Sequence, residues 1–290
     1  MTEASDTNDN DLSTDINALR SELDKTAKQL EVMTQQNDKL WRMLEEKRGF
    51  EPTYLDRQNL SEEEKHKIQE RINGLGKWFS QFHFGQGIRT PRAGCSIDYF
   101  RERAVRIFSA IEKHVEPSQS VLLDVGCADG FFPIEGLKRG FKKVIGVDPR
   151  PENIERCKLA AELHGFGNAE FLLDNIYELD IARDQKFDVV VCQGVFYHLS
   201  DPVRAMEKIF GATQTVAMVA GWTSAGEDET FKLSQEDEKH FLNGDRPILA
   251  IPTRNAKEKL MQMVGFSEVY EIQRPNIAAT GDWREFIGLT

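Results

Sequence analysis

The sequence predicts an α/β protein built on a mostly parallel, doubly wound sheet. Short apolar runs alternate with segments of helical character along the chain, which is the pattern that βαβ units produce. Several of these runs end in a glycine or an acidic residue, and such sheets bind ligands at the carboxyl ends of their strands. The clearest run, Val-Leu-Leu-Asp-Val-Gly at 121–126, is typical of a buried parallel strand that ends in a tight turn.

The turn after this strand predicts a ligand site. Residues 124–130 read D-V-G-C-A-D-G, and Gly126 and Gly130 can adopt backbone angles that side chains forbid, so a ligand can approach the main chain closely. A pyrophosphate on a helix N-terminus requires the different spacing G-x-G-x-x-G. A carboxylate at the turn repels phosphate and suits a cation. The spacing therefore argues against an NAD oxidoreductase and favours a nucleoside with a positively charged amino-acid tail.

A second strand completes the first βαβ unit. A helix is expected after the turn, to about Arg139, and Gly140 marks its end. The strand at 143–147 then ends in Asp148, about twenty residues past the turn, where an acid can accept both hydroxyls of a ribose.

The rest of the chain continues this alternation. The segment 223–248 is acidic, longer than a simple connection and predicted to be irregular; it either shapes a binding site or forms a solvated excursion. Further strands are expected at 169–173, 187–192, 214–221, 267–272 and 283–289, and helices at 61–74, 97–115, 152–164, 202–210 and 251–265.

The N-terminal part has a different pattern. Residues 1–11 are polar and acidic and are expected to be disordered. Apolar residues then recur at 3-4 spacing for over four heptads, with Ile16 at position a, and Asn37 falls at another a position, where a buried amide favours a parallel dimer. The sequence therefore predicts a coiled-coil helix over 12–50 that joins two copies through residues 12–47. The alternative is an amphipathic helix that packs on its own domain.

Between this helix and the main domain lies a mixed segment. Residues 51–96 are expected to hold a linker, the helix at 61–74 and an aromatic, glycine-broken loop at 78–91. The main domain is expected to cover 97–290.

Composition limits the class of protein. The net charge of −11 argues against a broad nucleic-acid surface. The four cysteines are scattered without a C-x-x-C pair, so neither a disulfide framework nor a metal site is expected. Neither a membrane-spanning run nor a signal peptide is recognised, and a cytoplasmic location is expected.

The turn at 124–132 resembles motif I of class I S-adenosylmethionine-dependent methyltransferases. Three further motifs, G-Q-G-I-R-T-P at 85–91, G-V-F-Y-H-L at 194–199 and I-P-T at 251–253, are similar to the wobble-uridine tRNA methyltransferase group and its small-molecule and glycan-modifying relatives. The resemblance covers roughly 78–290. It implies a Rossmann-like, seven-stranded methyltransferase fold, S-adenosyl-L-methionine as cofactor and S-adenosyl-L-homocysteine as product.

The resemblance also assigns a cofactor site at the strand ends. It implies that Asp124 or Asp129 meets the ammonium of the cofactor, that Asp148 holds the ribose, and that Asp174 with the following backbone meets the adenine. The full set of cofactor-binding candidates is Asp124, Gly126, Cys127, Asp129, Gly130, Asp148, Pro149, Asp174, Asn175, Ile176, Gln193 and Gly194.

Two histidines are candidates for the catalytic base. An oxygen nucleophile of high pKa must lose its proton as it attacks, which requires a general base. His198, just past the strand at 187–192, is the first candidate and His83 is the second, and either can instead be structural, bonding a loop carbonyl. The substrate-side candidates are Phe82, Arg89, Thr90 and Tyr197.

These observations predict methyl transfer to an oxygen, less readily a nitrogen, of a small molecule or a sugar. The negative charge and the lack of a distinctive basic pair for a carboxylated cofactor argue against tRNA as the acceptor. Two alternatives stay open: a tRNA wobble-uridine methyltransferase, and a cofactor-binding scaffold that its coiled coil recruits to a partner.

Overall fold

The computed structural model of the chain describes residues 19–26, 28–29, 53–91, 97–183, 185–236, 248–272 and 283–290, and the chain divides into two compact units, 1–52 and 53–290. In the first unit, residues 19–26 and 28–29 are helical, and both Leu19 and Leu23 are exposed. The expected disordered stretch and most of the expected coiled coil lie outside the described residues.

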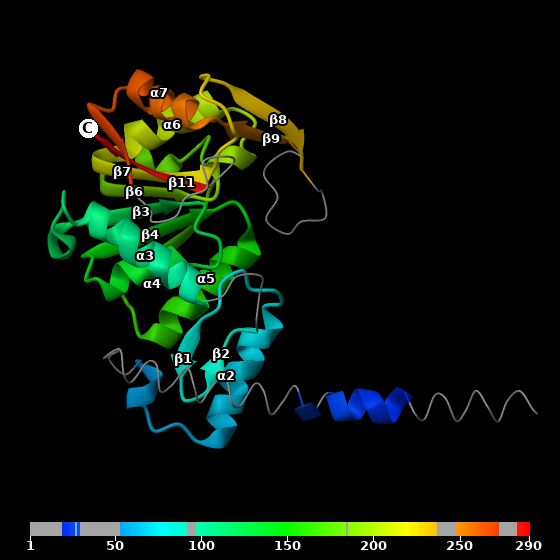
Figure 1. Cartoon of the computed structure of the whole chain (residues 1–290). Coiled ribbons are helices and arrows are strands. Elements are labelled where there is room, and N and C mark those ends of the chain that lie inside the picture. Colours follow the sequence, from blue (N-terminus) through cyan, green and yellow to red (C-terminus); the bar gives the residue numbers. More distant parts are fainter. Residues whose placement is uncertain are drawn as a thin grey trace, which may run out of the picture. The chain divides into compact units, whose positions relative to one another are not determined.

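A seven-stranded sheet forms the core of the second unit, as predicted (Figure 1). The strand order is β10-β11-β7-β6-β3-β4-β5; the five strands from β7 to β5 are parallel, and β11 runs antiparallel to both of its neighbours. The bounds are β3 Val121–Val125, β4 Lys143–Asp148, β5 Ala169–Leu173, β6 Phe187–Gln193, β7 Thr213–Trp222, β10 Glu268–Glu271 and β11 Trp283–Leu289.

Helices cover both faces of this sheet. Successive residues of a strand point to opposite faces, so Leu122 and Val189 pack in one core cluster with α3, α4 and α5, whereas Leu123 and Val190 pack in another with α6 and α7. The bounds are α3 Ile97–Ile111, α4 Phe131–Lys138, α5 Pro151–His164, α6 Pro202–Ala212 and α7 Arg254–Val264. Two buried layers therefore hold the strand ends in place.

Residues 53–91 pack as part of the same unit. They form a short 3-10 helix Leu55–Arg57, the helix α2 Glu62–Gly74, which opens with the predicted capping box, and a small hairpin of β1 His83–Gly85 and β2 Ile88–Arg89. Trp78, Phe82 and Phe84 are buried, and Phe84 contacts the ring of His164 on α5 with centroids 5.0 Å apart. The run predicted as a loop is therefore anchored by aromatic packing.

The prediction that 223–248 is irregular was wrong for part of this segment, and residues 237–247 lie outside the described residues. β8 Phe231–Gln235 and β9 Ile248–Pro252 form an antiparallel pair with Gln235 opposite Ile248. The helix expected from 251 begins instead at Arg254, because the Thr253 side chain accepts a hydrogen bond from the backbone N–H of Ala256 and caps α7. Four of the five residues of β8 are exposed, so this strand has little apolar alternation to reveal it.

Among the described residues, none of the helices has the length and apolar character needed to span a membrane.

The aromatic anchor of 53–91 gives the first testable prediction. Phe84→Ala removes a fully buried ring and should lower the free energy of unfolding, measured in urea, by about 3–5 kcal/mol. Leu233→Ala on β8, where the side chain is 72% exposed, is the matched control and should change it little. An equally small effect of Phe84→Ala would mean that 53–91 is not part of the cooperative core.

Candidate active site

The structure brings the predicted cofactor residues to one edge of the sheet. β3 is parallel to β4 and β6, with Val125 opposite both Val147 and Cys192. The residues that follow these strands therefore lie next to one another, at the carboxyl ends where ligands of such sheets bind.

The glycine loop after β3 has the backbone geometry that the sequence predicted. The close approach of a ligand was the predicted reason, and contacts within the chain are a second one. Gly126 and Gly130 have φ of +75° and +91°. A side chain at Gly126 would overlap Val195, and one at Gly130 would press on Cys157. Both glycines are thus required by contacts within the chain as well as by their φ angles.

Asp148 is completely buried and ties this loop to α5. Its Oδ2 accepts a hydrogen bond from the backbone N–H of Ala128 at 3.0 Å. Its Oδ1 accepts from the backbone N–H and Nε of Arg150 and from Nδ2 of Asn153, each at 3.0 Å. The predicted ribose acid therefore serves first as a structural anchor, and sequence reasoning missed Arg150 and Asn153 as its partners.

Asp124 lies close to this charge and keeps its proton at neutral pH. Burial, and secondarily the charge of Asp148, raise the pKa of Asp124 to about 8. In the part of the chain that the structure describes, no group donates a hydrogen bond to the Asp124 side chain.

Gln193 presents a second unsatisfied oxygen beside it. Asp124 pairs with Val191 across the ladder and Gln193 is two residues further along β6, so both side chains leave the same face of the sheet. The Oε1 atom of Gln193 is buried and has no hydrogen-bond partner among the described residues. A buried acceptor without a donor is costly, so these two side chains fit a ligand that brings hydrogen-bond donors.

Asp129 has a different role from the predicted contact with an ammonium group. Its carboxylate accepts hydrogen bonds from the backbone N–H groups of Phe79 and Ser80, both at 2.6 Å, and from the Ser80 hydroxyl at 2.7 Å. Burial raises the pKa of Asp129, and these bonds oppose that effect. Through these hydrogen bonds, Asp129 links the segment 53–91 to the glycine loop.

Two predicted substrate-side residues are core residues. The ring of Phe82 is buried and stacks on Phe84 with centroids 5.7 Å apart. The Thr90 hydroxyl is used inside the hairpin, accepting from the backbone N–H of Phe82 and donating to the carbonyl of Ser80. The aromatic segment folds on itself, so neither side chain has the predicted position. His83 and Arg89 face each other across the hairpin and are partly buried.

The remaining cofactor candidates form turns at the strand ends. The Asn175 side chain accepts from the backbone N–H groups of Tyr177 and Glu178, and its backbone carbonyl accepts from the N–H of Leu179. Asp174 accepts from the N–H of Asn175, and Ile176 is buried. Pro149 leads from β4 into α5.

Cys127 and Gly194 complete the predicted set. The Cys127 thiol is buried 3.7 Å from that of Cys157, a contact that with burial raises its pKa. Gly194 has φ of +73°, and its N–H donates to the carbonyl of Ala220 on β7.

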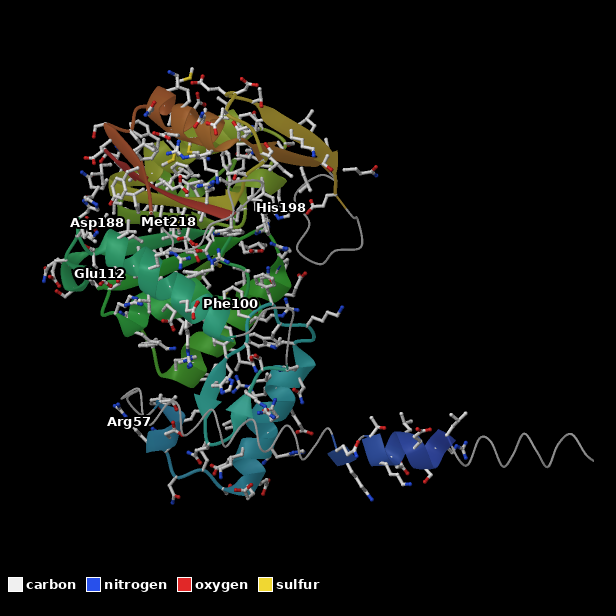
Figure 2. The ribbon with its side chains drawn as sticks, in the orientation of Figure 1. Arg57, Phe100, Glu112, Asp188, His198 and Met218 are labelled. Carbon is white, nitrogen blue, oxygen red and sulfur yellow. The ribbon has the colours of Figure 1, made fainter. Side chains whose placement is uncertain are left out.

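His198 has a carboxylate neighbour that the sequence did not reveal. It ends a 3-10 helix, Phe196–His198, directly after β6, on the side of the unit that carries the β8–β9 hairpin (Figure 2). Its Nδ1 lies 2.5 Å from Oε1 of Glu236, which is 7% exposed and follows β8. Glu236 belongs to an acidic segment, and nothing in its local sequence distinguishes it from the acids nearby.

An aromatic row adjoins this pair. Tyr197 contacts the ring of His198 with centroids 4.2 Å apart and Trp283 at 6.4 Å. Trp283 in turn lies 6.2 Å from Trp222, its partner in the β7–β11 ladder. Trp222 is 46% exposed, so the row runs from the histidine to the surface. The two tryptophans were not among the predicted site residues.

A family model described as a methyltransferase domain matches residues 117–264, about half of the chain. The chain belongs to the class I S-adenosylmethionine-dependent methyltransferases. The matched residues run from the approach to β3 through α7 and so include the glycine loop and the strand ends described above.

Curated relatives are similar to this methyltransferase-family chain over part of their length. It is 29% identical over 188 residues to a tRNA U34 carboxymethyltransferase of Sulfurovum sp. (strain NBC37-1), covering 59% of this chain and 56% of that protein. It is 31% identical over 102 residues to a ubiquinone biosynthesis O-methyltransferase of Neisseria meningitidis serogroup A, covering 34% and 43%. The chain thus spans about half the length of the curated relatives that it matches.

A solved structure resembles the fold. The N-terminal domain of EvdMO1 with SAH bound has a TM-score of 0.64 at 22% identity, covering 78% of this chain and 96% of that chain. This likeness supports the sheet and helix arrangement. The described ranges contain no group of three or more His, Cys, Asp or Glu side chains that could hold a metal ion.

The raised pKa of Asp124 gives the second prediction. Between its ordinary value of 3.8 and about 8 this group is protonated in the native state and ionised in the unfolded state, so raising the pH costs stability. The stability of the wild type relative to Asp124→Asn should therefore fall by on the order of 2–3 kcal/mol from pH 5 to pH 7.

Urea unfolding at the two pH values measures this difference. Asp228→Asn makes the same change at an exposed position and is the control. Parallel pH curves for the wild type and Asp124→Asn would contradict a native-state proton on Asp124.

Proposed function

We propose that this protein transfers a methyl group from S-adenosylmethionine to an oxygen of a small-molecule or sugar acceptor. The observation that carries the proposal is the pair of unsatisfied oxygens of Asp124 and Gln193 on one face at the strand ends. An ammonium group supplies the donors that these oxygens lack, and its charge favours the ionised form of Asp124. A phosphate group has neither property.

The other strand ends would hold the rest of the cofactor. Oδ2 of Asp148 carries fewer hydrogen bonds than Oδ1 and is the atom available to a ribose hydroxyl. The backbone N–H of Asn175 already donates to Asp174, so Asp174 and the backbone of Ile176 would meet the adenine. The bound cofactor supplies a methyl group already activated by its sulfonium, so the main contribution of the protein is to position donor and acceptor.

His198 is our candidate for the base. As the acceptor oxygen forms its bond to the methyl carbon, the carbon–sulfur bond breaks and its electron pair stays on sulfur. The hydroxyl proton passes to an imidazole nitrogen of His198. A base in this position contributes about 10²–10⁴-fold to the rate when the acceptor is an alcohol. His83, on the β1–β2 hairpin, is the second candidate.

The aromatic row supports a ring-shaped acceptor. Tyr197, Trp283 and the half-exposed Trp222 lead to His198. Arg103 covers the buried Trp283 ring, so the indole of Trp222 is the one that can offer apolar contact to the C–H face of a sugar while polar groups nearby meet its hydroxyls. The net charge of −11 also suits a neutral acceptor better than a polyanion.

A tRNA acceptor is the second candidate. The observation that favours it is the similarity to proteins named tRNA U34 carboxymethyltransferase, which holds over 59% of this chain. An electrophoretic shift assay with bulk tRNA at physiological salt measures tRNA binding and so separates the two candidates.

Calorimetry with S-adenosylhomocysteine tests the proposed function. The wild type should bind it, and two variants should each weaken binding by about tenfold or more: Gln193→Ala because it removes a hydrogen-bond acceptor for the ammonium group, and Asp124→Asn because it removes the carboxylate whose charge would pair with that group. Asp228→Asn, at an exposed position, should bind as the wild type does. Tight binding of NAD, or no effect of either site variant, would overturn the proposed function.

We also propose that residues 12–47 join two copies as a parallel coiled coil. In the described part of this segment, Leu19 and Leu23 lie one turn apart on a helix and are 65% and 70% exposed. Two leucines at this spacing form a face that a second helix can cover.

Truncation tests this dimer. A variant that begins at residue 53 keeps the whole second unit, and light scattering should find it as a monomer while the full chain is a dimer. Leu19→Asp with Leu23→Asp in the full chain should have the same effect. A dimer that survives truncation would contradict the proposal.

A further inference from the structure

The Glu236–His198 contact joins two segments that are far apart in the sequence. Glu236 directly follows the Gln235–Ile248 pair, where the β8–β9 ladder fixes the backbone. The 3-10 helix that carries His198 packs against β9. Both side chains are largely buried, at 6% exposure for Glu236 and 15% for His198. The hairpin therefore holds a carboxylate against one particular ring nitrogen.

We propose that Glu236 is a positioning residue, which keeps the proton of neutral His198 on Nδ1 and leaves Nε2 as the nitrogen that accepts the acceptor's proton. This inference rests on the proposed function, and it adds the group that orients the base.

The short distance decides where the proton lies. At 2.5 Å, the Glu236 carboxylate lies against Nδ1 but off the direction in which this nitrogen bonds, so the contact is electrostatic, and an unprotonated Nδ1 would bring its lone pair close to the negative charge. A proton on Nδ1 removes this repulsion and leaves the lone pair of the ring on Nε2. When Nε2 takes up a proton, the carboxylate also stabilises the positive charge of the ring.

Tyr197 and Lys257, two described polar residues on this side of the unit, do not supply a negative charge. Tyr197 contributes a ring contact on the same 3-10 helix. Lys257 donates a hydrogen bond to the carbonyl of Gly221, next to Tyr197. Burial lowers the pKa of Lys257 to about 7, so this side chain is only partly charged at neutral pH. Among these described neighbours, Glu236 is the one that supplies a negative charge to His198.

Acylation by diethyl pyrocarbonate tests this inference without a known acceptor. The reagent attacks an imidazole nitrogen that carries a free lone pair, and peptide mapping by mass spectrometry separates His198 from the other five of the six histidines. In the full-length wild type, His198 should be acylated at Nε2, and saturating S-adenosylhomocysteine should protect it. Glu236→Gln should slow acylation at His198 several-fold, because an amide can donate to Nδ1 and move the ring proton to Nε2.

Glu229→Gln makes the same change at an exposed position of the preceding loop and should react as the wild type does. Circular dichroism and thermal unfolding confirm that Glu236→Gln is folded, and Glu236→Asp, which keeps the carboxylate, should restore part of the reactivity. Equal rates for Glu236→Gln and Glu229→Gln, or an unreactive His198 in the wild type, would overturn the inference.

Protection by the ligand separates a catalytic setting from a structural one. A histidine–glutamate pair that only stabilises the fold would respond to Glu236→Gln but would not be shielded by S-adenosylhomocysteine. If calorimetry finds no binding of S-adenosylhomocysteine to the wild type, the proposed function fails, whatever the acylation rates. If binding is normal and His198 is not protected, only this inference fails.

Discussion

One buried negative charge organises the ligand edge of the sheet. An unpaired buried carboxylate costs several kcal/mol, so Asp148 needs the donors that Ala128, Arg150 and Asn153 provide. These bonds fix the glycine loop and the first turn of α5 at the same time. The same charge helps to keep Asp124 protonated. Asp124 is thus protonated at neutral pH, and a cationic ligand is the partner that can favour its ionised form.

Asp129 anchors the segment 53–91 through hydrogen bonds, as Asp148 anchors the glycine loop. Its three hydrogen bonds to Phe79 and Ser80 hold 53–91 against the glycine loop, and buried aromatic rings complete the attachment. A segment attached in this way is an integral part of the domain rather than a separate lid. The groups left to meet an acceptor are then those near β6, β7 and β11, where His198 and Trp222 lie.

The parts of the fold that sequence reasoning predicted are those with a local signal. Each parallel strand is an apolar run because both of its faces are buried, as Leu122 and Leu123 illustrate in their opposite clusters. β8 gave no such signal because most of its side chains are exposed. The aromatic segment at 78–91 was interpreted wrongly. An aromatic residue such as Phe82 looks the same in the sequence whether its ring packs in the core or lines a ligand-facing loop. Glu236 was missed because its role depends on a distant histidine.

This difference separates the two halves of the candidate site. The donor half is built from residues that immediately follow strands, so a motif in the sequence describes it, and the methyltransferase family model matches across it. The acceptor half is built from long-range pairs: Trp222 with Trp283 across the β7–β11 ladder, and His198 with Glu236 through the β8–β9 hairpin. Such pairs can change without disturbing the donor half, because they lie outside the glycine loop and its anchors. On the proposed function, acceptor choice in this chain would depend on the residues that only the folded sheet and its hairpin bring together.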